Sequence, residues 1–335
     1  MGMRRVELFK RLMGISILAM LLAAAAPAPA AQLTTDARGA IPHDVQQLVA
    51  IDYRAMQNST AAMNLRNRVM PPELKQFDEA LSKFTLKTGK TGASQGEPID
   101  DYVDELAFAL FRPSPGSDAL QTVGVAQGQF PTADILASFR AQKIRPTMVR
   151  TNSVYPMGKT GMVLCFVDPS TMIFGGKDSV TKSLDARDGM APSLLTNGSM
   201  MNAMQSVDSN PLWSILDNAG TQTMMKQLLG QAGSLTDFDT VKQRLEASWY
   251  SMDFSHGVKF DLTIETGDTF TAATMSSLLS AAVMVRKMTG SDTEKQALNE
   301  TSIDSDSGKL GIHFATSDTE FSALLQSPLF QNVVH

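Results

Sequence analysis

The chain has 335 residues, of which 43% are hydrophobic and 19% are charged, and its formal net charge is −5. This length and apolar content suffice for one large or two medium hydrophobic cores, which excludes disorder of the whole chain. The acidic balance argues against nucleic acid as a partner, and no basic run suggests an anionic membrane surface.

The first 30 residues have the pattern of an export signal. A basic start is followed by an apolar stretch of about 15 residues, short of the roughly 20 that span a bilayer, and then by Ala28-Pro29-Ala30. We therefore expect cleavage after Ala30, export to the periplasm or the medium, and no transmembrane segment in the remainder. The alternative is an uncleaved anchor. Residues 1–30 carry a net charge of +3, which leaves −8 for residues 31–335.

The chain has one cysteine, Cys165, in the apolar run "GMVLCFVD". It has no partner for an intramolecular disulfide, and its neighbours predict a buried small hydrophobic residue. A reactive thiol is the alternative, although such thiols usually lie at accessible sites near cationic groups.

The elements of the first half, residues 31–205, follow from periodicity and turn residues. We expect one strand, two helices, a loop, two strands, a helix, three strands and a closing helix. Their positions are residues 45–53, a helix from Asn58 or Ser59, a helix from Pro72 to Phe84, the loop 87–101, strands 105–112 and 121–130, the helix 131–143, strands 147–157, 161–168 and 171–176, and the helix 178–189.

A similar order returns in the second half, residues 206–335. We expect strands at residues 246–254 and 257–267, a long helix at 269–288, a hairpin at 301–316 and a helix at 317–326. The recurrence predicts two topologically similar halves of largely antiparallel sheet with helices packed on one face, which is an α+β fold.

Two strands and one helix predict where water meets the fold. "VKFDLTIE" at residues 258–265 alternates apolar and polar side chains, as expected of a sheet with one wet face. "GMVLCFV" does not alternate, so that strand should be covered on both faces. The helix at 269–288 has six Ser and Thr residues together with Arg286 and Lys287, which favours a helix buried across a sheet over a membrane span.

The tripeptide GKT occurs at residues 89–91 and 158–160. A phosphate-binding loop needs a glycine five positions before the glycine of Gly-Lys, but Phe84 and Ser153 stand there. The second copy lies between two predicted strands, with Gly158 and Gly161 on either side of Lys159 and Thr160. Small residues there favour a tight hairpin turn.

Two serine motifs also lack their context. Ser179 and Lys182 match the Ser-x-x-Lys of serine β-lactamases, but Lys159-Thr160-Gly161 precedes them, whereas that family places its Lys-Thr-Gly last. Residues 92–96, "GASQG", match the Gly-x-Ser-x-Gly of a nucleophile elbow, but no strand precedes them and no helix follows. We predict no catalytic residues.

Histidine and methionine give no sign of a metal site. His43, His256, His313 and His335 lack metal-ligand spacing, and His313 alternates with apolar residues so as to face solvent. The 21 methionines raise the possibility of Cu(I) binding, but methionine also fills irregular cores and adaptable surfaces. We predict no metal and no cofactor.

Taken together, the leader and the segments "AFALFRP", "VGVAQGQFP", "YPMGKTGM" and "DPSTMIFGG" resemble exported proteins of soil bacteria such as acidobacteria. The resemblance implies an exported α+β protein and supplies no catalytic motif. We therefore expect a non-enzymatic binding or interaction protein, with a small apolar ligand or an envelope protein as partner. The alternatives are a periplasmic hydrolase with dispersed residues, for which Ser179, Lys182 and Lys159 are the residues to test, and a structural envelope protein.

Overall fold

The structure is a computed structural model that describes residues 32–69, 102–113, 120–158, 161–229 and 238–327. Residues 31–335 form one compact unit. Several predictions lie outside the described residues: the leader at 1–30, the helix from Pro72 to Phe84, the loop at 87–101 with the first GKT and "GASQG", Lys159 and His335. The division at residue 205 stays a prediction.

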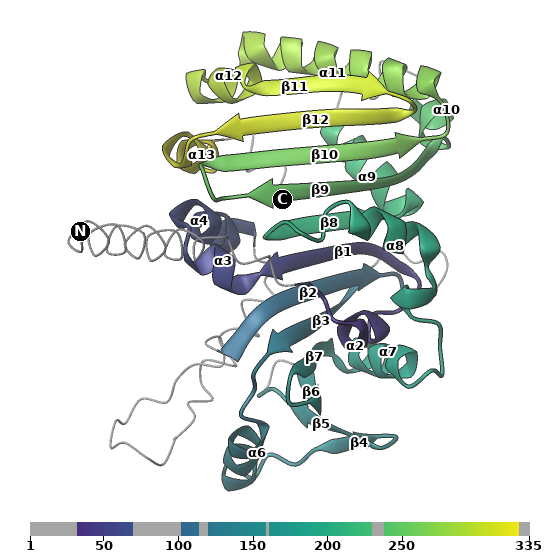
Figure 1. The fold of residues 1–335 in the computed structure, drawn as a ribbon, viewed down its shortest axis with the longest axis vertical. Coiled ribbons are helices and arrows are strands. Elements are labelled where there is room, and N and C mark those ends of the chain that lie inside the picture. Colours follow the sequence, from purple (N-terminus) through teal and green to yellow (C-terminus); the bar gives the residue numbers. More distant parts are fainter. Residues whose placement is uncertain (1–31, 70–101, 114–119, 159–160, 230–237, 328–335) are drawn as a thin grey trace, which may run out of the picture. The chain divides into compact units, whose positions relative to one another are not determined.

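Twelve strands form one antiparallel sheet (Figure 1), and the strand order is the same in both halves. From the central pair β1–β8, the order outward is β1-β2-β3-β7-β6 on one side and β8-β9-β10-β12-β11 on the other. The first half adds β5 and β4 at its end. The strands are β1 Val45–Asp52, β2 Val103–Phe111, β3 Gln121–Gly128, β4 Thr147–Val149, β5 Asn152–Pro156, β6 Met162–Asp168, β7 Thr171–Gly176, β8 Leu212–Leu216, β9 Leu245–Asp253, β10 Val258–Thr266, β11 Thr301–Asp306 and β12 Lys309–Thr316.

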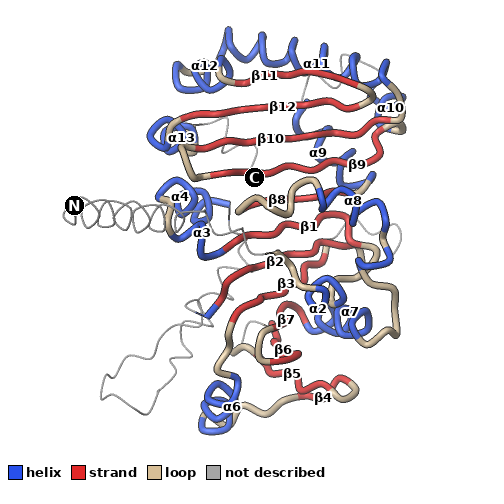
Figure 2. Tube along the Cα trace, in the orientation of Figure 1, coloured by secondary structure: helices blue, strands red, loops and turns tan. Residues whose placement is uncertain are grey.

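The helices lie at both ends of the sheet and over its middle (Figure 2). They are α2 Thr35–Gly39, α3 Tyr53–Gln57, α4 Thr60–Val69, α6 Thr132–Ala141, α7 Lys177–Arg187, the 3-10 helix η3 Leu194–Thr196, α8 Gly198–Gln205, α9 Asn218–Leu229, α10 Phe238–Lys242, α11 Thr269–Thr289, α12 Asp292–Asn299 and α13 Asp318–Leu324. The α+β prediction, with two topologically similar halves of antiparallel sheet, is therefore confirmed.

The sheet has two faces that differ in how they are covered. Face A carries Leu48, Trp213 and Ile173, and face B carries Phe108, Phe174 and Leu262, because residues paired across antiparallel strands point to the same side. In the first half, α2, α7 and α8 pack on face A, while α3 and α6 pack on face B.

The described helices of the second half pack on face B, as predicted, while α8 of the first half covers β8 and β9 on face A. Helix α13 and, from the first half, α4 contribute to one apolar cluster on face B, and α9 and α11 contribute to another. The reason lies in the strands: β10 buries Val258, Leu262 and Ile264 and exposes Lys259 and Asp261. The predicted alternation of this strand is confirmed, and one wet face needs no second layer.

The strands of the first half are apolar on both sides, which explains their second helical layer. In β6, Val163 and Cys165 join the core on face A, while Leu164 joins the core on face B. The prediction that this strand is covered on both faces is confirmed. Cys165 is a buried free thiol, and burial raises its pKa to about 11. That result supports its interpretation as a small hydrophobic residue.

Several parts of the chain differ from the sequence prediction, among them the helices α2 and α12, which were not predicted. Residues 147–157 were predicted as one strand, but they form the hairpin β4–β5, which turns at Arg150 with a φ of 54°. A non-glycine residue with positive φ is uncommon and gives no turn signal. The elements between residues 194 and 242, namely η3, α8, β8, α9 and α10, were not predicted at all.

The turn predicted at the second GKT is supported by the residues around it. Strands β5 and β6 pair on either side, with Pro156 opposite Val163. Gly158 and Gly161 have φ values of 61° and 76°, a region that glycine enters without a steric penalty. Lys159 and Thr160 themselves lie outside the described residues.

Candidate functional site

Ser179 and Lys182, the residues to test for a hydrolase, both lie on α7. Ser179 is only 4% exposed. The Lys182 ammonium lies 2.7 Å from Asp44 Oδ2 and 4.2 Å from the centroid of the Phe111 ring. Because the Lys182 ammonium is held by a carboxylate and an aromatic face, it is not placed to take a proton from Ser179.

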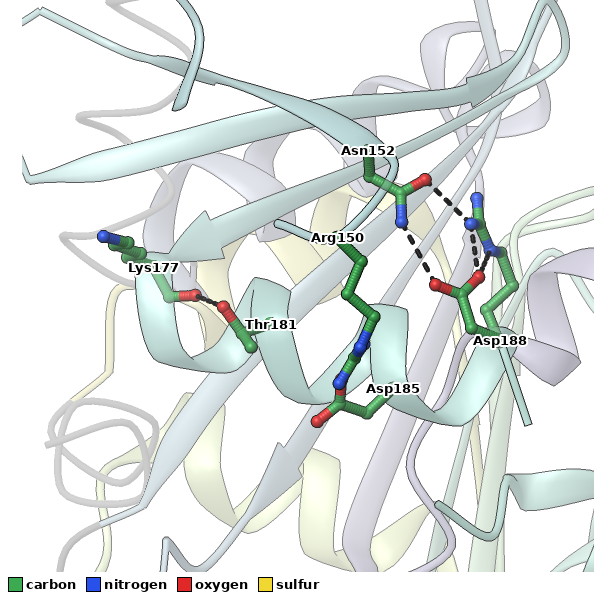
Figure 3. Close-up of polar contacts among 7 residues, drawn as sticks. Arg150, Asn152, Lys177, Thr181, Asp185 and Asp188 are labelled. Carbon is green, nitrogen blue, oxygen red and sulfur yellow. Dashed lines mark hydrogen bonds and ion pairs between the residues drawn. The ribbon is translucent and has the colours of Figure 1, made fainter. Parts of the chain in front are cut away.

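The C-terminal end of α7 carries a polar cluster that fastens the β4–β5 hairpin to the helix (Figure 3). Arg150 pairs with Asp185, and this hydrogen bond raises the pKa of Arg150. Asn152 Nδ2 donates to Asp188 Oδ2 at 3.1 Å, and Arg187 Nη2 donates to Asn152 Oδ1 at 2.8 Å. Each carboxylate in the cluster faces an arginine or an amide donor, which is the arrangement of a structural clasp.

The most perturbed acid is Glu105 on β2, which points to face A. Its side chain is 1% exposed, and neither carboxyl oxygen has a hydrogen-bond partner among the described residues. Burial raises its pKa to about 8; Asp52 and Asp208 add to this rise and Arg38 opposes it. A buried acid with a raised pKa is a common sign of a functional site, but this carboxyl has almost no surface through which a substrate could reach it.

His313 lies on the open part of face A between two carboxylates. Its Nδ1 is 2.6 Å from Asp261 Oδ1, and its Nε2 is 3.3 Å from Asp304 Oδ2. The prediction that His313 faces solvent is confirmed by its 46% side-chain exposure. The two carboxylates were missed because they come from neighbouring strands, and only the register of β10, β11 and β12 brings them together.

This part of face A has no metal-binding geometry. Each imidazole nitrogen of His313 is taken by a different carboxylate, so no ring nitrogen is left for an ion. Across the described ranges, no group of three or more His, Cys, Asp or Glu side chains is placed to hold a metal ion. His43 and His256 contact the hydroxyl groups of Thr196 and Ser255, both at 3.0 Å.

Helix α11 presents the most unusual surface of the described residues. Ten of its residues are exposed and none of the ten is charged. Four are large and apolar: Phe270 at 78% exposure, Met284 at 67%, Val285 at 62% and Met288 at 78%. Between them lie the exposed small residues Ala273, Ser277 and Ala281. We call these seven residues the outer stripe of α11.

The opposite side of α11 is held firmly. Ala272, Met275 and Leu279 are buried, and Met275 and Leu279 pack with Leu262 and Leu310 on face B. Arg286 Nη2 reaches Glu294 Oε1 on α12 at 3.0 Å. The prediction of a helix buried across the sheet therefore holds for one side of α11 only. In the described part of the chain, no helix is long and apolar enough to span a membrane.

The start of α11 is fixed by Asp268. Its Oδ1 accepts from Thr271 N at 2.7 Å, and its Oδ2 accepts from Arg244 Nη1 at 2.7 Å. The bond from the Thr271 amide and the partnership with Arg244 lower the pKa of Asp268 to about 2. The outer stripe is thus part of a fixed helix, which is the condition for a defined interaction surface.

A small hollow lies between α12, α13 and β12. Its volume is about 70 Å³, and it is lined by Gln296, Glu300, Phe314, Thr316, Glu320 and Leu324 among others. Its lining is largely apolar, but the hollow is far smaller than the roughly 300–1,000 Å³ of small-molecule sites. The outer stripe of α11 is therefore the best candidate site.

Comparisons with known proteins give a structural likeness alone. No known family model matches the sequence, and no curated protein matches it. Crystal forms I and III of TP0453, a Treponema protein, both have 12% sequence identity to this chain and a TM-score of 0.49. The match with form I covers 90% of this chain and 97% of the other, and that with form III covers 90% and 98%.

Proposed function

We propose that this protein is an exported, non-enzymatic interaction protein that docks its partner on the outer stripe of α11. The observation that carries the proposal is the absence of charge from all ten exposed residues of α11, together with the four large apolar side chains among them. Export rests on the basic, apolar and Ala-Pro-Ala pattern of the leader.

The energetics favour a covered stripe. Single exposed apolar residues are ordinary, but a continuous uncharged helix side with several large side chains marks an interaction surface. Burial of each large side chain would contribute about 1 kcal/mol or more to association. Other surface helices of the protein contrast with α11: the exposed residues of α6 include Asp134 and Arg140, and those of α7 include Lys177 and Asp178.

Photo-crosslinking from a single position tests this function. A photoreactive phenylalanine analogue replaces Met288 on the stripe or, as the control, Met190, which is exposed to 69% in the first half. In the bacterium that exports the protein, we expect a discrete adduct from position 288 and none from position 190. Equal adducts from both positions, or none from 288, would contradict the proposal.

A further inference from the structure

Resting on the proposed function, we propose that the partner on the outer stripe is a second copy of this chain, whose α11 packs antiparallel to the first about a two-fold axis. The stripe itself suggests this arrangement. If the axis passes beside residue 279, Phe270 of one copy faces Met288 of the other, Ala273 faces Val285, and Ser277 faces Ala281. A large side chain then meets a large one at each end of the helix pair, and a small side chain meets a small one beside the axis.

This order suits two crossing helices. Small side chains at the crossing point allow the helix axes to approach closely, and larger side chains fill the widening gap towards both ends. Ser277 and Ala281 would lie at the crossing, while Phe270 and Met288 lie a full helix length apart. A methionine sulfur against an aromatic ring is a favourable contact at each end.

The distribution of charge also favours a second copy. In a two-fold interface, a charged residue near the axis faces its own equivalent and is repelled. The exposed residues of α11 are uncharged throughout, so no such repulsion arises. The half-buried Lys287 in the last turn would lie near the first turn of the other copy, where Asp268 carries a negative charge with a pKa of about 2.

The position of α11 leaves room for the partner. The helix packs on β11, which is the last strand at its end of the sheet (Figure 1). A single helix pair lies at the low end of the roughly 1,200–2,000 Å² buried in specific interfaces. We therefore expect a reversible dimer, whose population depends on protein concentration.

Sedimentation velocity over a wide concentration range tests the dimer. We expect the wild-type protein to shift from monomer to dimer, and Met284→Glu with Met288→Glu to weaken dimerisation at least tenfold, because four carboxylates would then face an apolar surface. The matched control is Met148→Glu with Met190→Glu, two exposed methionines of the first half, which should dimerise as the wild type does. A wild-type protein that stays monomeric, or a dimer that survives the α11 substitutions, would overturn the proposal.

A disulfide test gives the geometry independently. Ser277→Cys with Ala281→Cys should form two disulfides between copies on mild oxidation, and reduction should reverse them. The control is Ala133→Cys with Ala137→Cys, an exposed pair with the same spacing on α6. Linkage that is no faster for the α11 pair than for the α6 pair would contradict the antiparallel arrangement.

The outcomes separate this proposal from the function on which it rests. A Met288 photo-adduct with a different protein, together with a monomeric wild type, would overturn the second copy and leave the interaction function standing. Binding of the monomer to vesicles of phosphatidylethanolamine and phosphatidylglycerol, abolished by the Met284→Glu and Met288→Glu pair, would overturn the second copy and make a lipid surface the partner.

Discussion

The two halves of the protein share a strand order and differ in which surface is polar. In the first half, both faces of the sheet lie under helices, and the outer sides of α6 and α7 carry charges. In the second half, the open face of the sheet carries the charges, and the outer side of α11 carries none. The same topology therefore gives a fully covered layer in one half and a layer with an uncharged outer helix in the other. Strand order alone does not decide where an interaction surface forms.

The two tryptophans provide the strongest test of this contrast, because both lie on face A. Trp213 on β8 is 1% exposed within the first-half core, whereas Trp249 on β9 is only partly buried at its margin. We expect Trp213→Ala to cost about 3–5 kcal/mol of unfolding free energy and Trp249→Ala about 1–2 kcal/mol. Urea unfolding followed by circular dichroism measures both. Equal losses would show that the cover of face A extends beyond β9.

The second-largest effect on stability is expected at Glu105, which is buried beneath the helices on face A. Its pKa is raised from 4.5 to about 8 by burial, so the folded state favours the protonated form. The stability that depends on this proton is complete below pH 4.5 and is lost as the pH rises through about 8. The shift in pKa limits the loss of unfolding free energy on ionisation of Glu105 to about 5 kcal/mol. We expect a loss of about 2 kcal/mol, because water that enters the site can solvate the buried charge.

Glu105→Gln should therefore stabilise the protein above pH 8 and leave its stability unchanged below pH 4, when measured as thermal midpoints across the pH range. Glu300→Gln, at an exposed position, is the control and should change neither. A variant whose stability falls with rising pH as steeply as that of the wild type would show that another group is responsible.

The sequence predicted the strands better than it predicted the surfaces. Strand β10 followed from its alternation, and β6 followed from its lack of alternation. Strand β8 was missed because "LWSIL" is five residues long and lies in a segment without periodicity. The β4–β5 turn was missed because Arg150 gives no turn signal.

The candidate site was beyond sequence reasoning for a different reason. A helix with few charges predicts burial on all sides, and α11 was interpreted in that way. The sequence cannot show that only one side of α11, the side that carries Ala272, Met275 and Leu279, packs against the sheet. The contacts of His313 likewise depend on strand register, which sets Asp261 beside it and Asp304 diagonally across.

A smaller effect is expected at the start of α11. Helix α7 buries five of its 11 residues and has no side-chain cap bond, whereas α11 buries four of 21 and relies on Asp268. Asp268→Ala should accelerate amide exchange in the first turn of α11 while its middle stays protected. The contribution of Asp268 is present above pH 3.8 and is lost as the pH falls through about 2. Asp292→Ala on α12 is the control, and equal exchange in both variants would contradict the role of the cap.

The smallest effect is expected at His313. It lies on face A, as Glu105 does, but on the part of that face that is open to solvent. Its partners Asp261 and Asp304 are 57% and 64% exposed, and exposed ion pairs contribute about 0–1 kcal/mol. His313→Asn should therefore change the unfolding free energy by less than about 0.5 kcal/mol, and high salt should remove even that difference. A loss above about 1 kcal/mol that persists in high salt would mean that His313 is buried in solution. Face A of the second half would then be covered by a partner, and the contrast between the halves would belong to the isolated chain only.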